Sequence, residues 1–164
     1  MNGEKKYYGK FRGVVSDNRD PLFLGRIKAK VSDVLGENES GWAMPAVPYA
    51  GKKVGLFLIP PTDALVWIEF EHGDPDYPIW TGCFWAQGEV PALSGVPEMK
   101  VLKTDVGTIT INDQKGDSGI TIETTNGMKI VMNTQGIEMT NGKGASVKLN
   151  NKKVSINDTA LEVE

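Results

Sequence analysis

The sequence predicts an all-β protein whose two halves are built differently. All aromatic residues lie between Tyr7 and Trp85, and every proline precedes residue 98. From residue 98 onward there is no aromatic residue, proline, histidine or cysteine. Short β-branched and aromatic runs fill the first half, short apolar–polar–apolar units fill the second, and no segment shows helical periodicity over three turns.

The first half is predicted to be a small barrel. Residues 26–32 alternate strictly, so Ile27, Ala29 and Val31 are expected to face a core. Residues 65–70 are apolar at nearly every position, as in a strand buried on both faces. Five strands in about 85 residues fit a closed barrel such as the oligonucleotide/oligosaccharide-binding (OB) fold. The expected strands are residues 11–16, 26–32, 53–59, 65–71 and 79–85.

The second half repeats a short strand-and-turn unit. Residues 88–97, rich in Gly, Pro and small side chains, are predicted to be a linker between an OB barrel at 1–87 and a β-helical segment at 98–164. Turns such as Asn126-Gly127 and Asn141-Gly142 separate the units and suit left-handed or hairpin backbone. Such a short period is typical of a β-solenoid or β-helix. The units are residues 108–112, 120–123, 128–133, 136–140, 147–150, 154–157 and 161–164.

One chain offers this second half a single apolar face and no second layer to cover it. Several copies around a common axis would bury these faces and leave few strand edges exposed. Three copies are the simplest way to close a prism of short flat faces, so we expect a trimeric, intertwined β-helix (β-prism). The expected core of the trimer axis consists of Ile109, Ile111, Ile120, Ile122, Met128, Ile130, Met132, Ile137, Met139, Val147, Leu149, Val154, Ile156, Leu161 and Val163.

Composition narrows the classes of function. The 18 basic and 21 acidic residues argue against a dedicated nucleic-acid binder. No apolar run is long enough for a membrane helix, and residues 1–10 show no signal peptide. Cys83 and His72 are the only residues of their types, so neither a disulfide framework nor a Cys/His metal cage is expected. No nucleophile, base and oxyanion site occur together, so we expect no enzyme, metal or cofactor.

Several conspicuous residues have simple structural interpretations. Arg26, Lys28 and Lys30 form a basic stripe that is interpreted as a solvated face or a subunit contact, with single-strand binding as the alternative. The acidic residues of 69–76 lack the spacing of a calcium loop, so a turn that includes His72 is expected there. Cys83, in an aromatic strand, is interpreted as a small core residue.

Two motifs resemble a known family. Residues 13–31 resemble the opening of the OB domain in phage baseplate spike proteins, and residues 66–82 resemble the Gly-Asp-Pro-Asp-x-Pro segment that closes it. The closing segment is also found in the valine-glycine repeat (VgrG) spikes of type VI secretion. The motif residues are Gly13, Asp20, Pro21, Gly25, Arg26, Gly73, Asp74, Pro75, Asp76, Pro78 and Gly82.

The resemblance implies a homotrimeric central spike of a contractile tail or injection machine, in which an OB collar sits on a hub and a β-helix points toward the target cell. This chain lacks the hub region of VgrG, an inserted lysozyme domain and a terminal His-x-His tip. A separate baseplate hub protein and a separate tip protein of the PAAR (proline-alanine-alanine-arginine) type are therefore expected as partners. The target-cell envelope is expected as a transient partner.

The resemblance leaves the type of machine open between a phage tail, a tailocin-like particle and an extracellular injection system. Type VI secretion is disfavoured because its spike usually carries the hub in the same chain. In each case the chain is expected to assemble in the cytoplasm and then become part of a baseplate. Two alternatives remain: a β-helical receptor-binding fibre fragment and an OB protein that binds single-stranded nucleic acid.

Overall fold

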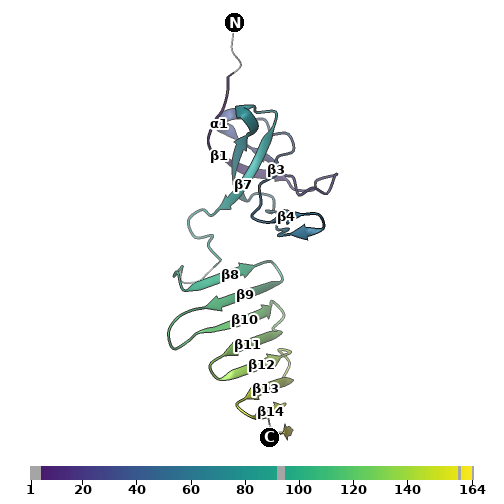
Figure 1. Cartoon of the computed structure of the whole chain (residues 1–164), viewed down its shortest axis with the longest axis vertical. Helices are drawn as coiled ribbons and strands as arrows, with labels where there is room; N and C mark the ends of the chain where they lie inside the picture. Colours follow the sequence, from purple (N-terminus) through teal and green to yellow (C-terminus); the bar gives the residue numbers. More distant parts are fainter. Residues whose placement is uncertain (1–4, 92–94, 159, 164) are drawn as a thin grey trace. The chain divides into compact units, whose positions relative to one another are not determined.

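The computed structural model describes residues 5–91, 95–158 and 160–163. The chain divides into two compact units, residues 1–89 and 90–164 (Figure 1). Nearly all regular structure is β, and α1 (Ser32–Leu35) and the 3-10 turn η1 (Glu71–Gly73) are each a single short turn. The described helices are far too short to span a membrane.

The first unit contains a five-stranded sheet in the order β2-β1-β6-β7-β3. Neighbouring strands are antiparallel except for β3 and β7, which are parallel through Met44 opposite Ile79 and Pro45 opposite Trp80. A separate hairpin is formed by β4 (Ala50–Gly51) and β5 (Val54–Gly55). The strands of the sheet are β1 (Phe11–Asp17), β2 (Lys28–Lys30), β3 (Met44–Pro45), β6 (Leu65–Phe70) and β7 (Pro78–Phe84).

Hydrogen bonds between its two edges close this sheet into an OB-like barrel. Ile27, next to β2, and Ala43, next to β3, exchange two backbone hydrogen bonds of 2.7 and 3.2 Å. The enclosed core confirms the alternation of residues 26–32, because Ile27, Ala29 and Val31 are fully buried. The other core residues are Val15, Ala43, Val66, Ile68, Phe70 and Trp80.

Three expectations for this unit are wrong. Residues 53–59 do not form one strand: Val54–Gly55 pairs with β4 and the Leu56 N–H donates to the Tyr49 carbonyl at 2.9 Å, but no described strand lies beside residues 57–59. Strand β6 is buried on one face only, since Val66 and Ile68 are buried whereas Trp67 is half-buried. Cys83 is an exposed free thiol on β7 rather than a core residue.

The second unit is a single eight-stranded sheet in the order β15-β14-β13-β12-β11-β10-β9-β8. Each strand is antiparallel to the next one along the chain, so one chain forms a meander with short turns. Its strands are β8 (Met99–Lys103), β9 (Gly107–Asn112), β10 (Gly119–Thr124), β11 (Lys129–Asn133), β12 (Gly136–Thr140), β13 (Ser146–Asn150), β14 (Lys153–Ile156) and β15 (Leu161–Val163).

Each of the seven repeat units expected from the sequence corresponds to one of the strands β9–β15. The turns between them are stabilised locally by asparagine side chains. The Oδ1 atoms of Asn133 and Asn141 accept hydrogen bonds from the backbone N–H two residues later, at 2.8 and 2.9 Å. The winding of three such meanders around one axis stays a prediction.

Candidate assembly surface

Strand register brings the apolar side chains of the second unit into two columns that cross the sheet. In each strand the two inward positions lie opposite the two inward positions of the next strand. The first column consists of Leu102, Ile109, Ile122, Ile130, Met139, Val147, Ile156 and Leu161. The second consists of Lys100, Ile111, Ile120, Met132, Ile137, Leu149, Val154 and, by register alone, Val163.

These two columns, without Lys100, are called the apolar face below. Its side chains are only half covered by one another: Ile111 is 42% exposed and Ile130 is 36% exposed. No other described element of the second unit packs on this face. A continuous exposed apolar surface of this kind marks an interaction site. The apolar face is therefore the candidate assembly surface of the second unit.

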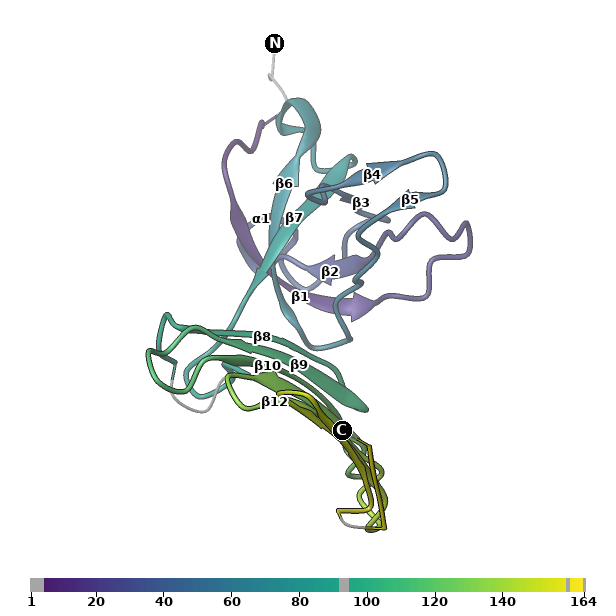
Figure 2. The same cartoon turned by 60° about the horizontal axis from the view of Figure 1, so that its bottom comes forward.

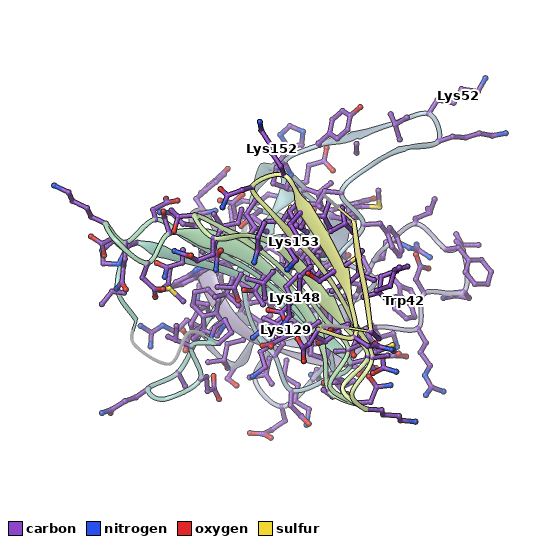
Figure 3. All side chains as sticks on the ribbon, turned by 90° about the horizontal axis from the view of Figure 1, so that it is seen from below. Trp42, Lys52, Lys129, Lys148, Lys152 and Lys153 are labelled. Atoms are coloured by element: carbon purple, nitrogen blue, oxygen red, sulfur yellow. The ribbon has the colours of Figure 1, made fainter. Side chains whose placement is uncertain are left out.

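The opposite face of the same sheet is polar. Lys129 lies 3.7 Å from Glu123 on the neighbouring strand, and Lys148 lies 3.4 Å from Glu138 and 2.8 Å from Asp158. Hydrogen bonds from Lys148 to Asp158 and then Glu138 raise the pKa of this lysine. Figure 3 labels Lys129, Lys148 and Lys153, which lie on β11, β13 and β14. Cross-strand pairs of opposite charge suit a face that stays in water.

All the residues expected in the trimer axis fall on the apolar side of their strands, as far as the structure describes them. Met128 lies just before β11 and shares the side of Ile130 and Met132. The side chain of Val163 lies outside the described residues, and its backbone pairs with Val154. That these residues form a trimer axis stays a prediction.

Sequence reasoning missed the first strand of this sheet, β8. Leu102 lies opposite Ile109 and extends the first column by one layer. The run Met99–Lys103 has adjacent apolar residues, Val101 and Leu102, so alternation alone does not reveal which of the two faces inward. The pairing of Leu102 with Ile109 on β9 shows that Leu102 is the inward-facing residue.

In the first unit, the buried side chain of the motif residue Asp20 holds a loop in place. Its hydrogen bonds and its ion pair with Arg26 are called the Asp20 brace below. Its carboxylate accepts hydrogen bonds from the backbone N–H groups of Leu22 (3.0 Å), Leu24 (2.8 Å) and Arg26 (3.3 Å). The Arg26 guanidinium pairs with it at 2.6 Å. Gly25, at φ +76°, lets the chain turn back at this point, and its carbonyl accepts a 3.1 Å hydrogen bond from the indole of Trp80. The brace therefore fixes the loop between β1 and β2.

The remaining motif residues also have structural roles. Gly13 faces the core on β1, where an added Cβ would lie 3.0 Å from the Ile68 side chain. Asp74 accepts a hydrogen bond from the Asp76 backbone N–H (3.1 Å) and pairs with Lys6 (3.3 Å), confirming a turn there. The others lie in the same regions: Pro21 in the braced loop, Gly73 and Pro75 in the turn, and Pro78 and Gly82 in β7.

The basic stripe is largely neutralised within the chain. Arg26 pairs with Asp20, and Lys28 pairs with Glu39 at 2.8 Å. The charged groups of Arg26 and Lys28 lie 5.6 and 5.5 Å from the ring centre of Trp42. The described residues contain no cluster of His, Cys, Asp or Glu that could hold a metal.

The Asp20 brace leads to a prediction for pH. The Arg26 side chain, followed by the three backbone N–H groups, holds the pKa of Asp20 well below its usual range. A carboxyl with a lower pKa in the folded state stabilises the fold above its unfolded pKa, about 3.9, and loses this contribution as the pH falls further. The first unit is therefore expected to lose stability below about pH 4.

Replacing Asp20 by Asn should lower the melting temperature at pH 7 and weaken this pH dependence, because the largely covered guanidinium of Arg26 then loses its counter-charge. All tryptophans lie in the first unit, so tryptophan fluorescence reports on that unit alone. Asp76→Asn, at an exposed motif position, is the matched control. Equal melting curves for the two variants would show that the brace contributes nothing.

Comparison with known proteins matches both units. Residues 11–85 match the family described as the type VI secretion system/phage-baseplate injector OB domain, and residues 99–162 match the phage baseplate V C-terminal trimerisation domain. A type VI secretion system spike protein of Pseudomonas aeruginosa, VgrG5, is 34% identical over 109 residues. The match covers 58% of this chain and 14% of VgrG5. The chain thus spans a small part of that relative.

The two family matches follow one another in the order of the two structural units and together span most of the chain. They agree with the closed OB-like barrel and with a sheet whose apolar face is uncovered. The all-β class with an N-terminal OB barrel is confirmed. The chain belongs to the baseplate V family of VgrG-like spike proteins, found in phage baseplates and type VI secretion systems.

Proposed function

We propose that this chain is the structural central spike of a contractile tail or injection machine. It acts as a homotrimer that caps the baseplate hub or tube and pierces the target-cell envelope when the sheath contracts. The observation that carries the proposal is the apolar face: its two columns stay in register across the strands of the meander. Three such faces around one axis bury each other and leave three polar, ion-paired faces in water.

The meander also suits a part that carries axial load. Eight strands spaced about 4.8 Å apart give a sheet about 35 Å long across the strands. Strand length falls from six residues in β9 and β10 to four in β14 and three in β15, so the sheet narrows along the chain. If three chains are intertwined, none can leave alone, which raises the barrier to unfolding.

Two protein partners are part of the proposal. A separate hub protein holds the collar formed by the OB units. A separate PAAR-type tip protein binds beyond β15, the edge strand of the described sheet, where Leu161 at the end of the first column is 53% exposed. The chain assembles in the cytoplasm and then becomes part of the baseplate, and its contact with the envelope is transient. Its role is mechanical and needs no catalytic step.

The native mass of the full chain in solution tests the trimer. Light scattering after size exclusion should give three times the chain mass of 17.8 kDa, and the assembly should resist dissociation in detergent. A monomer would contradict the proposal, because the apolar face would then have no partner chain. A stable dimer would contradict the three-sided arrangement.

The piercing role needs a separate test in assembled particles. In contractile particles whose own spike gene is deleted, supplying this chain with its hub should restore baseplate assembly and killing of target cells. A pull-down with the matching PAAR-type protein should recover a complex. Normal killing by particles that contain no copy of the chain would overturn the proposed role.

A further inference from the structure

Six of the large exposed apolar side chains of the first unit belong to one loop and to the region of one hairpin. Loop residues Leu22, Phe23 and Leu24 are 62%, 89% and 52% exposed. Near the β4–β5 hairpin, Tyr49, Leu56 and Phe57 are 60%, 48% and 72% exposed. These six residues are called the collar patch below. Figure 2 shows the loop and the hairpin extending from the same side of the barrel.

The loop and the hairpin form one continuous surface. Phe23 and Leu24 line, together with Tyr49 and Phe57, an open hollow of about 520 Å³. Phe23 and Phe57 also border a second hollow that reaches Asp20. The patch therefore combines projecting apolar side chains with hollows beside them. A surface of this shape can interlock with the surface of another protein molecule.

The collar patch is held in place rather than loose. The Asp20 brace binds the backbone N–H groups of Leu22 and Leu24, the two neighbours of Phe23. Phe23 itself has φ +57°, a conformation that is unusual for a bulky side chain. The chain thus fixes a strained phenylalanine in solvent and gains no intramolecular burial for it. A preorganised exposed aromatic residue of this kind is typical of an anchor at an interface.

We infer that the collar patch is an interface between copies of this chain, where the three patches of a trimer meet around the threefold axis. This inference rests on the proposed trimer. The matched trimerisation domain lies in the same chain, and only 14 residues separate Phe84 from Met99, a reach of about 50 Å at full extension. Such tethering gives the three OB units millimolar effective concentrations, at which even a weak contact forms.

A second copy is the occupant that fits best, because the matched trimerisation domain brings copies with the same exposed apolar surface close to one another. The other large exposed apolar residues outside the loop and the hairpin region, such as Tyr8, Tyr77 and Trp85, are not part of the patch or its hollows. Around a threefold axis each patch can contact both neighbours at once. Lys52 and Lys53 lie at the hairpin tip without an ion pair among the described residues, and Figure 3 shows Lys52 extending outward. They suit the polar rim of an interface.

Replacing Phe23 and Phe57 together by Ser in the full chain tests the inference. In the wild-type trimer these side chains are buried between copies, so the variant should keep its trimeric mass but melt at least about 5 °C lower by tryptophan fluorescence. The control is the double variant Tyr8→Ser and Tyr77→Ser, which removes two exposed rings outside the patch. An unchanged or raised melting temperature in the patch variant would overturn the inference, and the patch would then be open to another protein such as the hub.

Cross-linking tests the proposed interface between copies independently of the melting temperature. In a Cys83→Ser background, Leu22→Cys treated with a short bis-maleimide should link two of the three copies and leave one unlinked. Tyr77→Cys should run as a monomer on a denaturing gel after both samples have been boiled to dissociate the trimer. No linked dimer from Leu22→Cys in a protein of trimeric mass would reject the collar interface alone. A monomeric wild-type mass would reject the proposed spike trimer itself.

Discussion

Replacing Ile130 by Asp is expected to abolish the trimer. Ile130 occupies the middle of the first column, opposite Ile122 on one side and Met139 on the other. In a trimer the substitution would bury three carboxylates near one axis, and the described side chains of the two columns include no cation except Lys100 at the first layer. The effective penalty is several kcal/mol for each unpaired buried ion, which is more than the loss of an isoleucine contact alone.

Light scattering should report the mass of a single chain or of soluble aggregates for this variant. Thr121→Asp is the matched control, because it adds the same charge on the polar face of the adjacent strand β10. That control should remain trimeric. Tryptophan fluorescence should show a folded first unit in both variants, since all tryptophans lie there. A trimer of wild-type stability from Ile130→Asp would show that the apolar face is not the axis.

Gly136→Ala is expected to separate two strands of the same sheet. Gly136 has φ +138°, and a Cβ at this position would lie 2.0 Å from the carbonyl oxygen of Leu149. The obstacle is backbone in the neighbouring strand, so it cannot rotate away as a side chain would. Strands β12 and β13 must move apart, which disturbs the pairs of Ile137 with Leu149 and Met139 with Val147. We expect the free energy of unfolding of the second unit to fall by about 3 kcal/mol or more per chain.

The measurement is the temperature at which the trimer dissociates in detergent, because the second unit has no aromatic residue to report on its unfolding. Gly116→Ala is the control: Gly116 has φ +93° in a turn, and an added Cβ would meet no atom within 4 Å. This control measures the destabilisation caused by placing alanine at a positive φ, without a steric clash of the added Cβ with a neighbouring strand. If both variants dissociate at the same temperature, the close approach of β12 and β13 has no part in assembly.

The sequence carried strong information about the second unit, because its strands follow one simple rule. Alternation with period two determines which side chains share a face, and this holds for each strand however it pairs. The residues from Ile109 to Leu161 that were expected to face inward therefore lie on one face of the sheet. Asn-Gly turns were recognised as suited to hairpins, and the observed strands are indeed antiparallel neighbours.

The first unit was less predictable, because part of its barrel depends on contacts between distant residues. Strands β3, β4 and β5 have two residues each and carry no pattern of their own. β3 exists because Met44 pairs with Ile79, far along the chain, and closure depends on the bonds between Ile27 and Ala43. The apolar run after Val54 resembles a strand, yet Phe57 is 72% exposed. Apolar composition alone does not distinguish a core strand from an exposed surface.

For the candidate sites, the sequence pattern and the tertiary contacts provide different information. The sequence by itself determined the two-part organisation, the all-β class and the apolar face, because these follow from composition and from a period that is local. Only the tertiary structure revealed the extra layer at Leu102, the buried pairing of Asp20 with Arg26 and the gathering of Phe23 and Phe57 into one patch. Each of these depends on which segments meet in space, and pairing between distant segments is decided by the free energy of the whole fold.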